Sequence, residues 1–295
     1  MLKIREFVTE NGVNAIHIEN APNISLFKTF DCGQCFRFNP VSVFGNKYEV
    51  GGVALGRYVI FAQEREDELI VYNCTRDDFD TYWKSFLDLE NDYDKINSQI
   101  VTAAKSEHMQ RAVEYGSGIR ILKQELWECM ISFIISQNNN IPRIKKIVEK
   151  LCLEYGEKIT FLDNTFYTFP TPEALSRLSD TALAETTKMG FRAKYVLDAA
   201  RWFLSTPAPY LTLGKDPDYN KDFDALCEVK GIGPKVASCI MLFGLSRGEA
   251  FPIDVHIRRT LERYFPNGLD VAALGKTAGI AQQYLFYYEK YNQNT

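Results

Sequence analysis

A lysine and an aspartate nineteen positions apart have the surroundings that most favour chemistry in this sequence. Lys235 follows a Gly-Ile-Gly-Pro turn, and Asp254 stands in Phe251-Pro-Ile-Asp-Val-His256, just before a predicted helix. An amine attacks a carbonyl-like carbon once it is deprotonated, and removal from water favours the deprotonated form. A carboxylate at a helix N-terminus stays ionised because the helix dipole favours negative charge there. Together the two groups could form a covalent imine and stabilise a cation that develops beside it.

Both side chains also have purely structural interpretations. Lys235 could be a solvated lysine or a simple phosphate contact, since lysines are mostly exposed. Asp254 could act only as the N-cap of the helix that follows it. The choice between these interpretations depends on the segment that carries the lysine.

That segment, Val229-Lys-Gly-Ile-Gly-Pro-Lys-Val-Ala237, predicts a tight turn between two helices. Gly231 and Gly233 tolerate positive φ and close backbone approach, and Pro234 suits a first helical turn. Ile232 is expected to fill the space between the helices. Because N–H groups at a helix N-terminus form an anion site, we interpret the segment as a helix-hairpin-helix in which both glycines contact DNA phosphates. An ordinary helix–helix turn is the alternative.

The composition is that of a soluble globular protein with a mildly acidic charge. The 295 residues are 46% hydrophobic and 24% charged, with a formal net charge of −4. Nucleic-acid binders usually carry a basic surface, because phosphate neutralisation supplies much of their affinity. A helix-hairpin-helix removes this objection because its backbone N–H groups need little net positive charge.

Cysteine usage and hydropathy predict a cytoplasmic protein without metal or cofactor. The seven cysteines show no extracellular pattern, and Cys32-Gly-Gln-Cys35 is a lone CxxC without a second pair or a βαβ context. The first residues form no apolar signal region. The longest apolar runs, such as 130–135, are too short to cross a bilayer.

The first third of the sequence predicts antiparallel strands followed by helices. A capping-box pattern at Thr75-Arg-Asp-Asp78 opens a helix whose aromatic face we assign to the core. The expected strands cover residues 13–18, 36–38, 47–50, 57–62 and 69–73.

From about residue 119 the apolar period is helical to the end, with no convincing strand. We place a domain boundary near residue 117, in the Tyr115-Gly-Ser-Gly118 linker. The prediction is an α+β fold: an N-terminal antiparallel β domain with helices (1–117), then an all-helical body containing the helix-hairpin-helix (118–295). The expected helices cover residues 123–136, 139–155, 172–178, 190–204, 222–228, 234–245, 255–265 and 275–290.

The segments GIGPKVASC and FPIDVH resemble the DNA glycosylases named for a helix-hairpin-helix and a Gly/Pro-rich loop ending in Asp. Within that superfamily the chain resembles the 8-oxoguanine DNA glycosylase family, from Gly33 to Phe286. The resemblance implies a glycosylase and abasic-site lyase acting on duplex DNA that contains 8-oxoguanine opposite cytosine. It implies that Lys235 is the Schiff-base nucleophile and Asp254 the carboxylate of the loop. We expect a monomer.

The resemblance also assigns a base pocket. The carbonyl of Gly33, in Asp31-Cys-Gly-Gln-Cys-Phe36, would accept a hydrogen bond from N7–H, a donor that guanine lacks. Such a site rejects guanine because a buried acceptor is left unpaired. Phe286 and Cys239 would lie on either side of the flipped base, and Gln282 would contact its Watson–Crick edge. Without the resemblance, these are a turn glycine, a core Phe, a small buried Cys and a solvated Gln.

Excision requires the nucleotide to leave the stack, and the resemblance assigns residues to the gap. Asn138 would fill it, and Arg143 and Arg192 would contact the estranged cytosine. Phe191, where the family often has Tyr, would wedge beside that cytosine, and His256 would contact a phosphate or sugar. The segment around Asn138 could instead be a polar helix cap.

Two other functions are compatible with parts of the pattern. Superfamily members that act on oxidised pyrimidines or mispaired adenine often carry a four-cysteine iron–sulfur site, but no cysteine follows Cys239 here. Glycosylases for alkylated bases lack a lysine at the position of Lys235. A non-catalytic module could bind DNA through the hairpin alone, but it could not form a covalent adduct.

Overall fold

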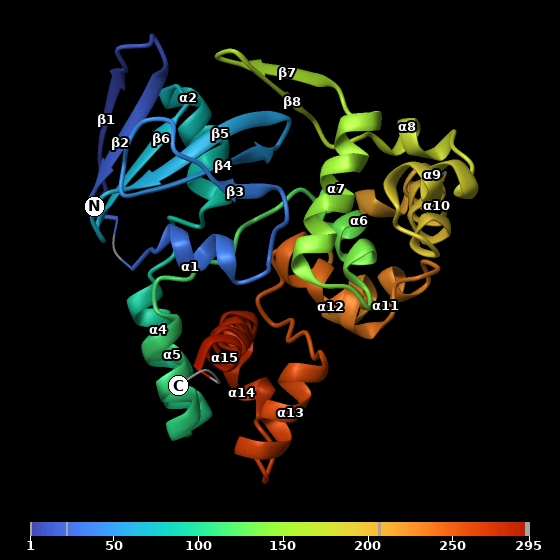
Figure 1. Cartoon of the computed structure of the whole chain (residues 1–295). Coiled ribbons are helices and arrows are strands. Elements are labelled where there is room, and N and C mark those ends of the chain that lie inside the picture. Colours follow the sequence, from blue (N-terminus) through green and yellow to red (C-terminus); the bar gives the residue numbers. More distant parts are fainter. Residues whose placement is uncertain (1, 22, 206–207, 293–295) are drawn as a thin grey trace.

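A six-stranded antiparallel sheet forms the first region of the chain (Figure 1). The structure, a computed structural model, describes residues 2–21, 23–205 and 208–292. The strand order is β1-β2-β6-β5-β4-β3, and all neighbours are antiparallel. The strands are β1 (Lys3–Val8), β2 (Asn14–Glu19), β3 (Phe38–Pro40), β4 (Tyr48–Ala54), β5 (Arg57–Gln63) and β6 (Glu68–Tyr72).

The central strand β5 is buried on both faces because its alternating residues belong to two different apolar clusters. Val59 and Phe61 face a cluster that includes Trp83, whereas Tyr58 and Ile60 face a second, smaller cluster. The first cluster is covered by α1 (Leu26–Asp31), a π-helical turn (Phe79–Trp83) and α3 (Lys84–Phe86). The short helix α2 (Arg76–Asp78) leads into the π-helical turn. The capping box predicted at residues 75–78 is confirmed.

The second region is built mainly from helices. In Figure 1 the helices between residues 126 and 243 lie on the side opposite β1 and β2, and those from residue 255 onward lie below the sheet. Several of these helices follow a capping side chain or carry a proline in the first turn, as at Asn140 and Pro142 before and within α7. The helices are α6 (Leu126–Ser136), α7 (Ile141–Tyr155), α8 (Pro172–Ser176), α9 (Asp180–Thr187), α10 (Arg192–Phe203), α11 (Tyr219–Cys227), α12 (Pro234–Phe243), α13 (Val255–Tyr264), α14 (Val271–Leu274) and α15 (Ala278–Asn292).

The expectation that this body is all-helical is wrong in one place. The strands β7 (Lys158–Phe161) and β8 (Asn164–Tyr167) form a hairpin there. Phe166 stacks on Tyr58 of β5 with ring centroids 3.7 Å apart, so the hairpin is held by the face of the large sheet. Strands of four residues are too short for their alternation to be recognised, and their stabilising contact lies in the other region.

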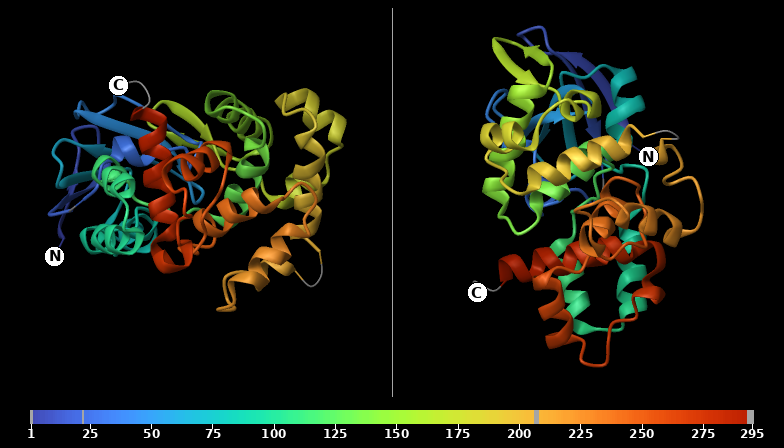
Figure 2. Two further views of the ribbon diagram at one scale, coloured as in Figure 1. Left: turned by 90° about the horizontal axis from the view of Figure 1, so that it is seen from below. Right: turned by 90° about the vertical axis from the view of Figure 1, so that its right-hand side faces the viewer.

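Helices α4 (Tyr93–Ala104) and α5 (Glu107–Gly116) precede the predicted boundary yet share a core cluster with the helical body. The last helix, α15, lies beside them in both views of Figure 2. A Cβ on Gly116 would lie 2.5 Å from a ring carbon of Tyr284, so the two helices meet at a residue without a side chain. The boundary near residue 117 stays a prediction.

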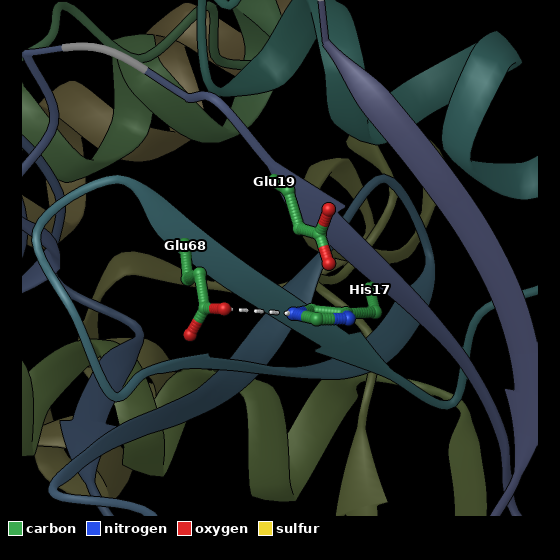
Figure 3. Close-up of side chains that lie close together, drawn as sticks. All are labelled: His17, Glu19 and Glu68. Atoms are coloured by element: carbon green, nitrogen blue, oxygen red, sulfur yellow. Dashed lines mark ion pairs between the residues drawn. The ribbon is translucent and has the colours of Figure 1, made fainter.

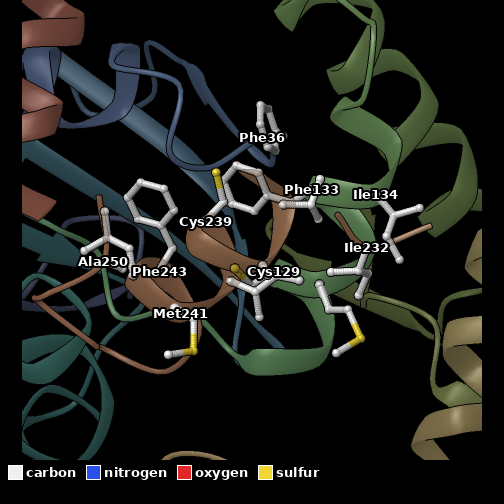
Figure 4. Packing of buried hydrophobic residues seen from close by; sticks show 14 of the residues in the cluster. Phe36, Cys129, Phe133, Ile134, Ile232, Cys239, Met241, Phe243 and Ala250 are labelled. Atoms are coloured by element: carbon white, nitrogen blue, oxygen red, sulfur yellow. The ribbon is translucent and has the colours of Figure 1, made fainter. Parts of the chain in front are cut away.

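The core of the body centres on α6 and α12, which pack side by side (Figure 4). Phe133 of α6 and Phe243 of α12 stack with centroids 5.4 Å apart and planes 8° apart. Cys129 and Ile134 of α6 are fully buried. This packing fixes the direction in which the first turns of α12 present Lys235 and Cys239.

Candidate active site

Residues predicted from distant parts of the sequence line a single pocket. It lies between the loop after α1, the first turns of α12, the segment before α13, and α15. Its lining includes every residue predicted for catalysis and base recognition: Gly33, Lys235, Cys239, Asp254, Gln282 and Phe286.

Lys235 occupies the first turn of α12, with its ammonium nitrogen 5.4 Å from the centre of the Phe133 ring. Cys239 lies one helical turn further on and is 3% exposed. Burial raises the pKa of the Cys239 thiol, while the neighbouring Lys235 opposes this shift. The amine of this half-buried lysine therefore sits beside an aromatic face and a thiol in the wall of the pocket.

Asp254 is the N-cap of α13, and its Oδ1 accepts a hydrogen bond from the N–H of Ile257 at 2.8 Å. The capping role considered from the sequence is therefore real, but the same carboxylate also lines the pocket with Lys235. The cap fixes the rotamer of the Asp254 side chain. Such a carboxylate can stabilise a positive charge that develops in the pocket.

Gly33 adopts a φ of +80°, and the loop presses its backbone against the pocket wall. A Cβ here would lie 3.3 Å from Cδ1 of Ile141 and 3.8 Å from a ring carbon of Phe286. Glycine is required because L side chains rarely adopt this conformation.

Gln34 anchors this loop, and the sequence did not reveal it. It is 1% exposed, and its Nε2 donates to the carbonyls of Thr29 (2.9 Å) and Arg120 (2.8 Å). Its Oε1 accepts from the N–H of Leu122 at 2.8 Å. Arg120 and Leu122 lie more than eighty positions further along the chain, so no local pattern could indicate these bonds.

Helix α15 contributes three side chains to the pocket. Gln282 and Gln283 are buried, and Phe286 faces Gly33. Near the other end of α15, Lys290 donates to the carbonyl of Asp31, and the Tyr291 hydroxyl donates to the carboxylate of the same residue. Helix α15 is thus tied to the end of α1 beside the base pocket.

The turn predicted between two helices connects α11 to α12. Gly231 has a φ of +88°, and a Cβ there would lie 2.3 Å from the Tyr195 ring. Gly233 is the N-cap of α12, and a Cβ on it would meet nothing within 4 Å. The first glycine is thus required by packing, whereas the second leaves the helix N-terminus open on its outer side.

Asn138 lies in the loop between α6 and α7 with a φ of +47°. It does not cap α7: that role belongs to Asn140, whose side chain accepts from the N–H of Arg143. The neighbouring Gln137 donates from Nε2 to the carbonyl of Gly231 at 2.8 Å. The loop and the hairpin therefore form one connected surface.

Arg192 secures the same loop from α10. It is 3% exposed and donates to the carbonyls of Gln137 (2.9 Å), Asn138 (2.8 Å) and Met189 (3.1 Å). Its guanidinium also lies 4.5 Å from the ring centre of Phe191, which is 59% exposed.

Arg143 and His256 are exposed. A guanidinium nitrogen of Arg143 lies 3.5 Å from the carbonyl of Lys188, beside the start of α10. Its charge, together with burial, lowers the pKa of Arg192, so the two arginines are electrostatic neighbours. His256 lies in the first turn of α13, two residues after Asp254.

One cluster elsewhere has the residue types of a metal site. His17, Glu19 and Glu68 lie together on β2 and β6 (Figure 3). Each is already paired with a cation: Arg5 lies 3.3 Å from His17 Nδ1, Lys3 2.6 Å from Glu19, and Arg65 2.9 Å from Glu68. We assign this cluster to surface ion pairing, because a metal would have to displace three cations.

The CxxC thiols are buried, and Cys32 also lines the base pocket. Burial raises the pKa of Cys32 to about 12 and that of Cys35 still further, so neither is a reactive thiolate near neutral pH. No helix among residues 2–21, 23–205 and 208–292 is long and apolar enough to cross a membrane.

Comparison with protein families divides the chain into two adjoining parts. Residues 16–130 match the N-terminal domain of 8-oxoguanine DNA glycosylase. Residues 131–270 match the HhH-GPD superfamily of base excision DNA repair proteins. The fold and the hairpin therefore define a helix-hairpin-helix protein of base excision repair.

Individual relatives cover nearly the whole chain. The N-glycosylase/DNA lyase of Saccharomyces cerevisiae is 30% identical over 262 residues, covering 83% of this chain and 69% of the relative. The structure of MBOgg1 with a low-affinity DNA ligand is 34% identical, with a TM-score of 0.90 and full coverage of both chains. A second similar structure is that of the Clostridium acetobutylicum 8-oxoguanine glycosylase/lyase, bound to double-stranded DNA with cytosine opposite 8-oxoG. It is 30% identical, with a TM-score of 0.87, and the match covers 99% of this chain and 98% of that one. The chain belongs to the 8-oxoguanine DNA glycosylase family.

Proposed function

We propose that this protein excises 8-oxoguanine opposite cytosine from duplex DNA and then cleaves the strand as an abasic-site lyase. The observation that carries the proposal is the pocket itself. Four separate segments contribute to it an amine, a carboxylate held as a helix cap, a glycine with positive φ and an aromatic ring. The names of the yeast and clostridial relatives support the same pair of activities.

In this mechanism Lys235 attacks C1′ of the damaged nucleotide with its uncharged amine. The bond from C1′ to the base breaks, and the base leaves with the bonding electrons and takes up a proton. Asp254 stabilises the positive charge that develops on the sugar, from the position fixed by its cap. The attached nitrogen then loses a proton and its lone pair breaks the C1′–O4′ bond, so that the sugar ring opens, O4′ takes up a proton and an imine joins Lys235 to C1′. Loss of a C2′ proton then expels the 3′ phosphate by β-elimination.

Base recognition uses the remaining pocket residues. The carbonyl of Gly33 accepts from N7–H of 8-oxoguanine, and Phe286 and Cys239 flank the base. Gln282 contacts the Watson–Crick edge. Because guanine lacks N7–H, it leaves the Gly33 carbonyl unpaired in a buried site, which disfavours its binding.

DNA is held by the surface that connects the hairpin to the loop around Asn138. We assign Gly231, Gly233 and His256 to the backbone of the damaged strand and Asn138 to the gap left by the flipped base. The side chains assigned to the estranged cytosine are Phe191, Arg143 and Arg192. We infer that the protein acts as a monomer, because every assigned residue belongs to one chain. We also infer that it acts in the cytoplasm.

A direct assay tests this function. The protein is incubated with end-labelled duplexes containing 8-oxoguanine opposite cytosine, guanine opposite cytosine, or 3-methyladenine opposite thymine. Released bases are identified by chromatography, and strand products by gel electrophoresis. We expect release of 8-oxoguanine and a β-elimination product from the first duplex alone. Release of 3-methyladenine without 8-oxoguanine would assign the protein to alkylation repair instead.

A further inference from the structure

Gln283 is a second amide in the base pocket, adjacent to Gln282 on α15. It is 5% exposed and lines the same pocket as Lys235. Its Nε2 donates to Oε1 of Gln282 at 3.0 Å. Its own Oε1 is buried without a hydrogen-bond partner among the described residues.

A buried amide oxygen without a partner is uncommon in a folded protein, and its desolvation costs free energy. The other amide in this pair has its oxygen engaged by Gln283, which turns the NH₂ group of Gln282 away from that bond. The two neighbouring side chains therefore offer one donor group, on Gln282, and one acceptor, on Gln283.

A donor on Gln282 beside an acceptor on Gln283 is complementary to the Watson–Crick edge of guanine but not to that of adenine. The Watson–Crick edge of guanine and of 8-oxoguanine presents the acceptor O6 beside the donors N1–H and the 2-amino group. The corresponding edge of adenine presents a 6-amino donor beside the acceptor N1. An adenine-type base would place N1 against the Gln283 oxygen, leaving two acceptors facing each other in a buried site.

We propose that Gln283 determines specificity for the guanine edge. Its Oε1 accepts a hydrogen bond from the N1–H and 2-amino side of the flipped base, and its Nε2 holds the amide of Gln282 with the NH₂ group toward O6. The inference rests on the proposed function and adds a contact that none of the residues assigned above supplies.

The test compares two bases in two proteins. Single-turnover release is measured for 8-oxoguanine and for 8-oxoadenine, each opposite cytosine, with the parent protein and with Gln283→Met. Methionine keeps the length of the side chain and removes both amide functions. We expect release of 8-oxoguanine to fall about tenfold and release of 8-oxoadenine to stay unchanged or rise, because the acceptor that opposes N1 is gone, so that the preference falls at least about tenfold.

Gln110→Met is the matched control, because it makes the same change at an exposed position of α5. Thermal unfolding is measured for both variants. If Gln283→Met does not fold, Gln283→Asn replaces it. The asparagine side chain is one methylene shorter, which withdraws the amide from the base, so this variant is also expected to lower the preference for 8-oxoguanine. Equal loss on both bases, or no loss on either, would overturn the inference. A parent protein that releases no 8-oxoguanine would instead refute the proposed function.

Discussion

The base pocket and the surface assigned to the opposite strand are built in different ways. The pocket draws up to three residues from each of several distant segments and buries most of them. The opposite-strand surface comes from two short segments, around Asn138 and around Phe191, and its side chains are largely exposed apart from Arg192. Chemistry thus depends on long-range packing, whereas contact with the second strand depends on local loops tied together by one arginine.

The largest effect is expected inside the pocket. Lys235→Gln removes the amine and should lower base release and strand cleavage by roughly a thousandfold or more, as loss of a nucleophile does. Binding of the lesion duplex should change little, because the hairpin and the loops remain. Single-turnover kinetics and a binding titration check both parts. Full cleavage by the variant would show that another group attacks C1′.

The next effect separates backbone strain from pocket geometry. Gly33→Ala should cost about 1–2 kcal/mol of stability because of its positive φ. It should also slow base release by about tenfold to a hundredfold, since the new Cβ crowds Cδ1 of Ile141 at 3.3 Å and shifts the loop that carries the Gly33 carbonyl. Gly12→Ala is the matched control, with a φ of +75° and open space around its Cβ. Its stability should fall similarly and its activity should not; equal activity losses would contradict the role of the pocket.

The two arginines test the opposite-strand surface. Arg192→Ala should lower the free energy of unfolding by about 3 kcal/mol, because three loop carbonyls lose a charged donor. Arg143→Ala should leave stability unchanged. Both should weaken the preference for cytosine opposite the lesion, by about 1–3 kcal/mol for a lost polar contact with the base. Thermal unfolding and excision from the four possible pairs measure these effects. Equal excision from all four pairs by the parent would refute the proposal that these arginines recognise the cytosine opposite the lesion.

The smallest effect concerns the support behind the pocket. His108 of α5 stacks on Tyr264 of α13, with centroids 3.7 Å apart, and lies 3.0 Å from Glu289 of α15. Burial lowers the pKa of His108, so the unfolded chain binds its proton more tightly than the folded protein does. This contribution to stability is complete above the unfolded pKa and is lost as pH falls below about 6.5. Denaturant unfolding between pH 5 and 8 should show the free energy of unfolding falling as the pH falls in the parent. The same plot should have a shallower slope for His108→Gln.

The sequence predicted well whatever depends on neighbours along the chain. The hairpin at residues 229–237 and the capping box at residues 75–78 are local patterns, and their observed elements differ from the predicted bounds by only a few residues. The short hairpin β7–β8 and strand β1 were missed, because sheet pairing stabilises them more than local pattern does. Lys235 and Asp254 stood out from their local surroundings, whereas the other assigned pocket residues came from a family resemblance.

Local sequence pattern could not predict the residues that hold the site in place through long-range hydrogen bonds. Gln34, which anchors the Gly33 loop, bonds to backbone groups far along the chain. Gln283 looked like any other helical glutamine, and Arg192 was assigned to DNA although most of its visible bonds go to protein carbonyls. Each of these roles depends on which segments the fold brings together.

Borohydride trapping tests the central claim most directly. The parent, Lys235→Gln and Lys230→Gln are each incubated with a labelled duplex containing 8-oxoguanine opposite cytosine; Lys230 is an exposed lysine of the same hairpin and gives the matched control. Borohydride reduces an imine between the protein and DNA to a stable covalent bond. We predict a trapped complex for the parent and for Lys230→Gln, and none for Lys235→Gln or for undamaged DNA. Base release by the parent with no trapped complex would contradict amine catalysis and point to water activated beside Asp254.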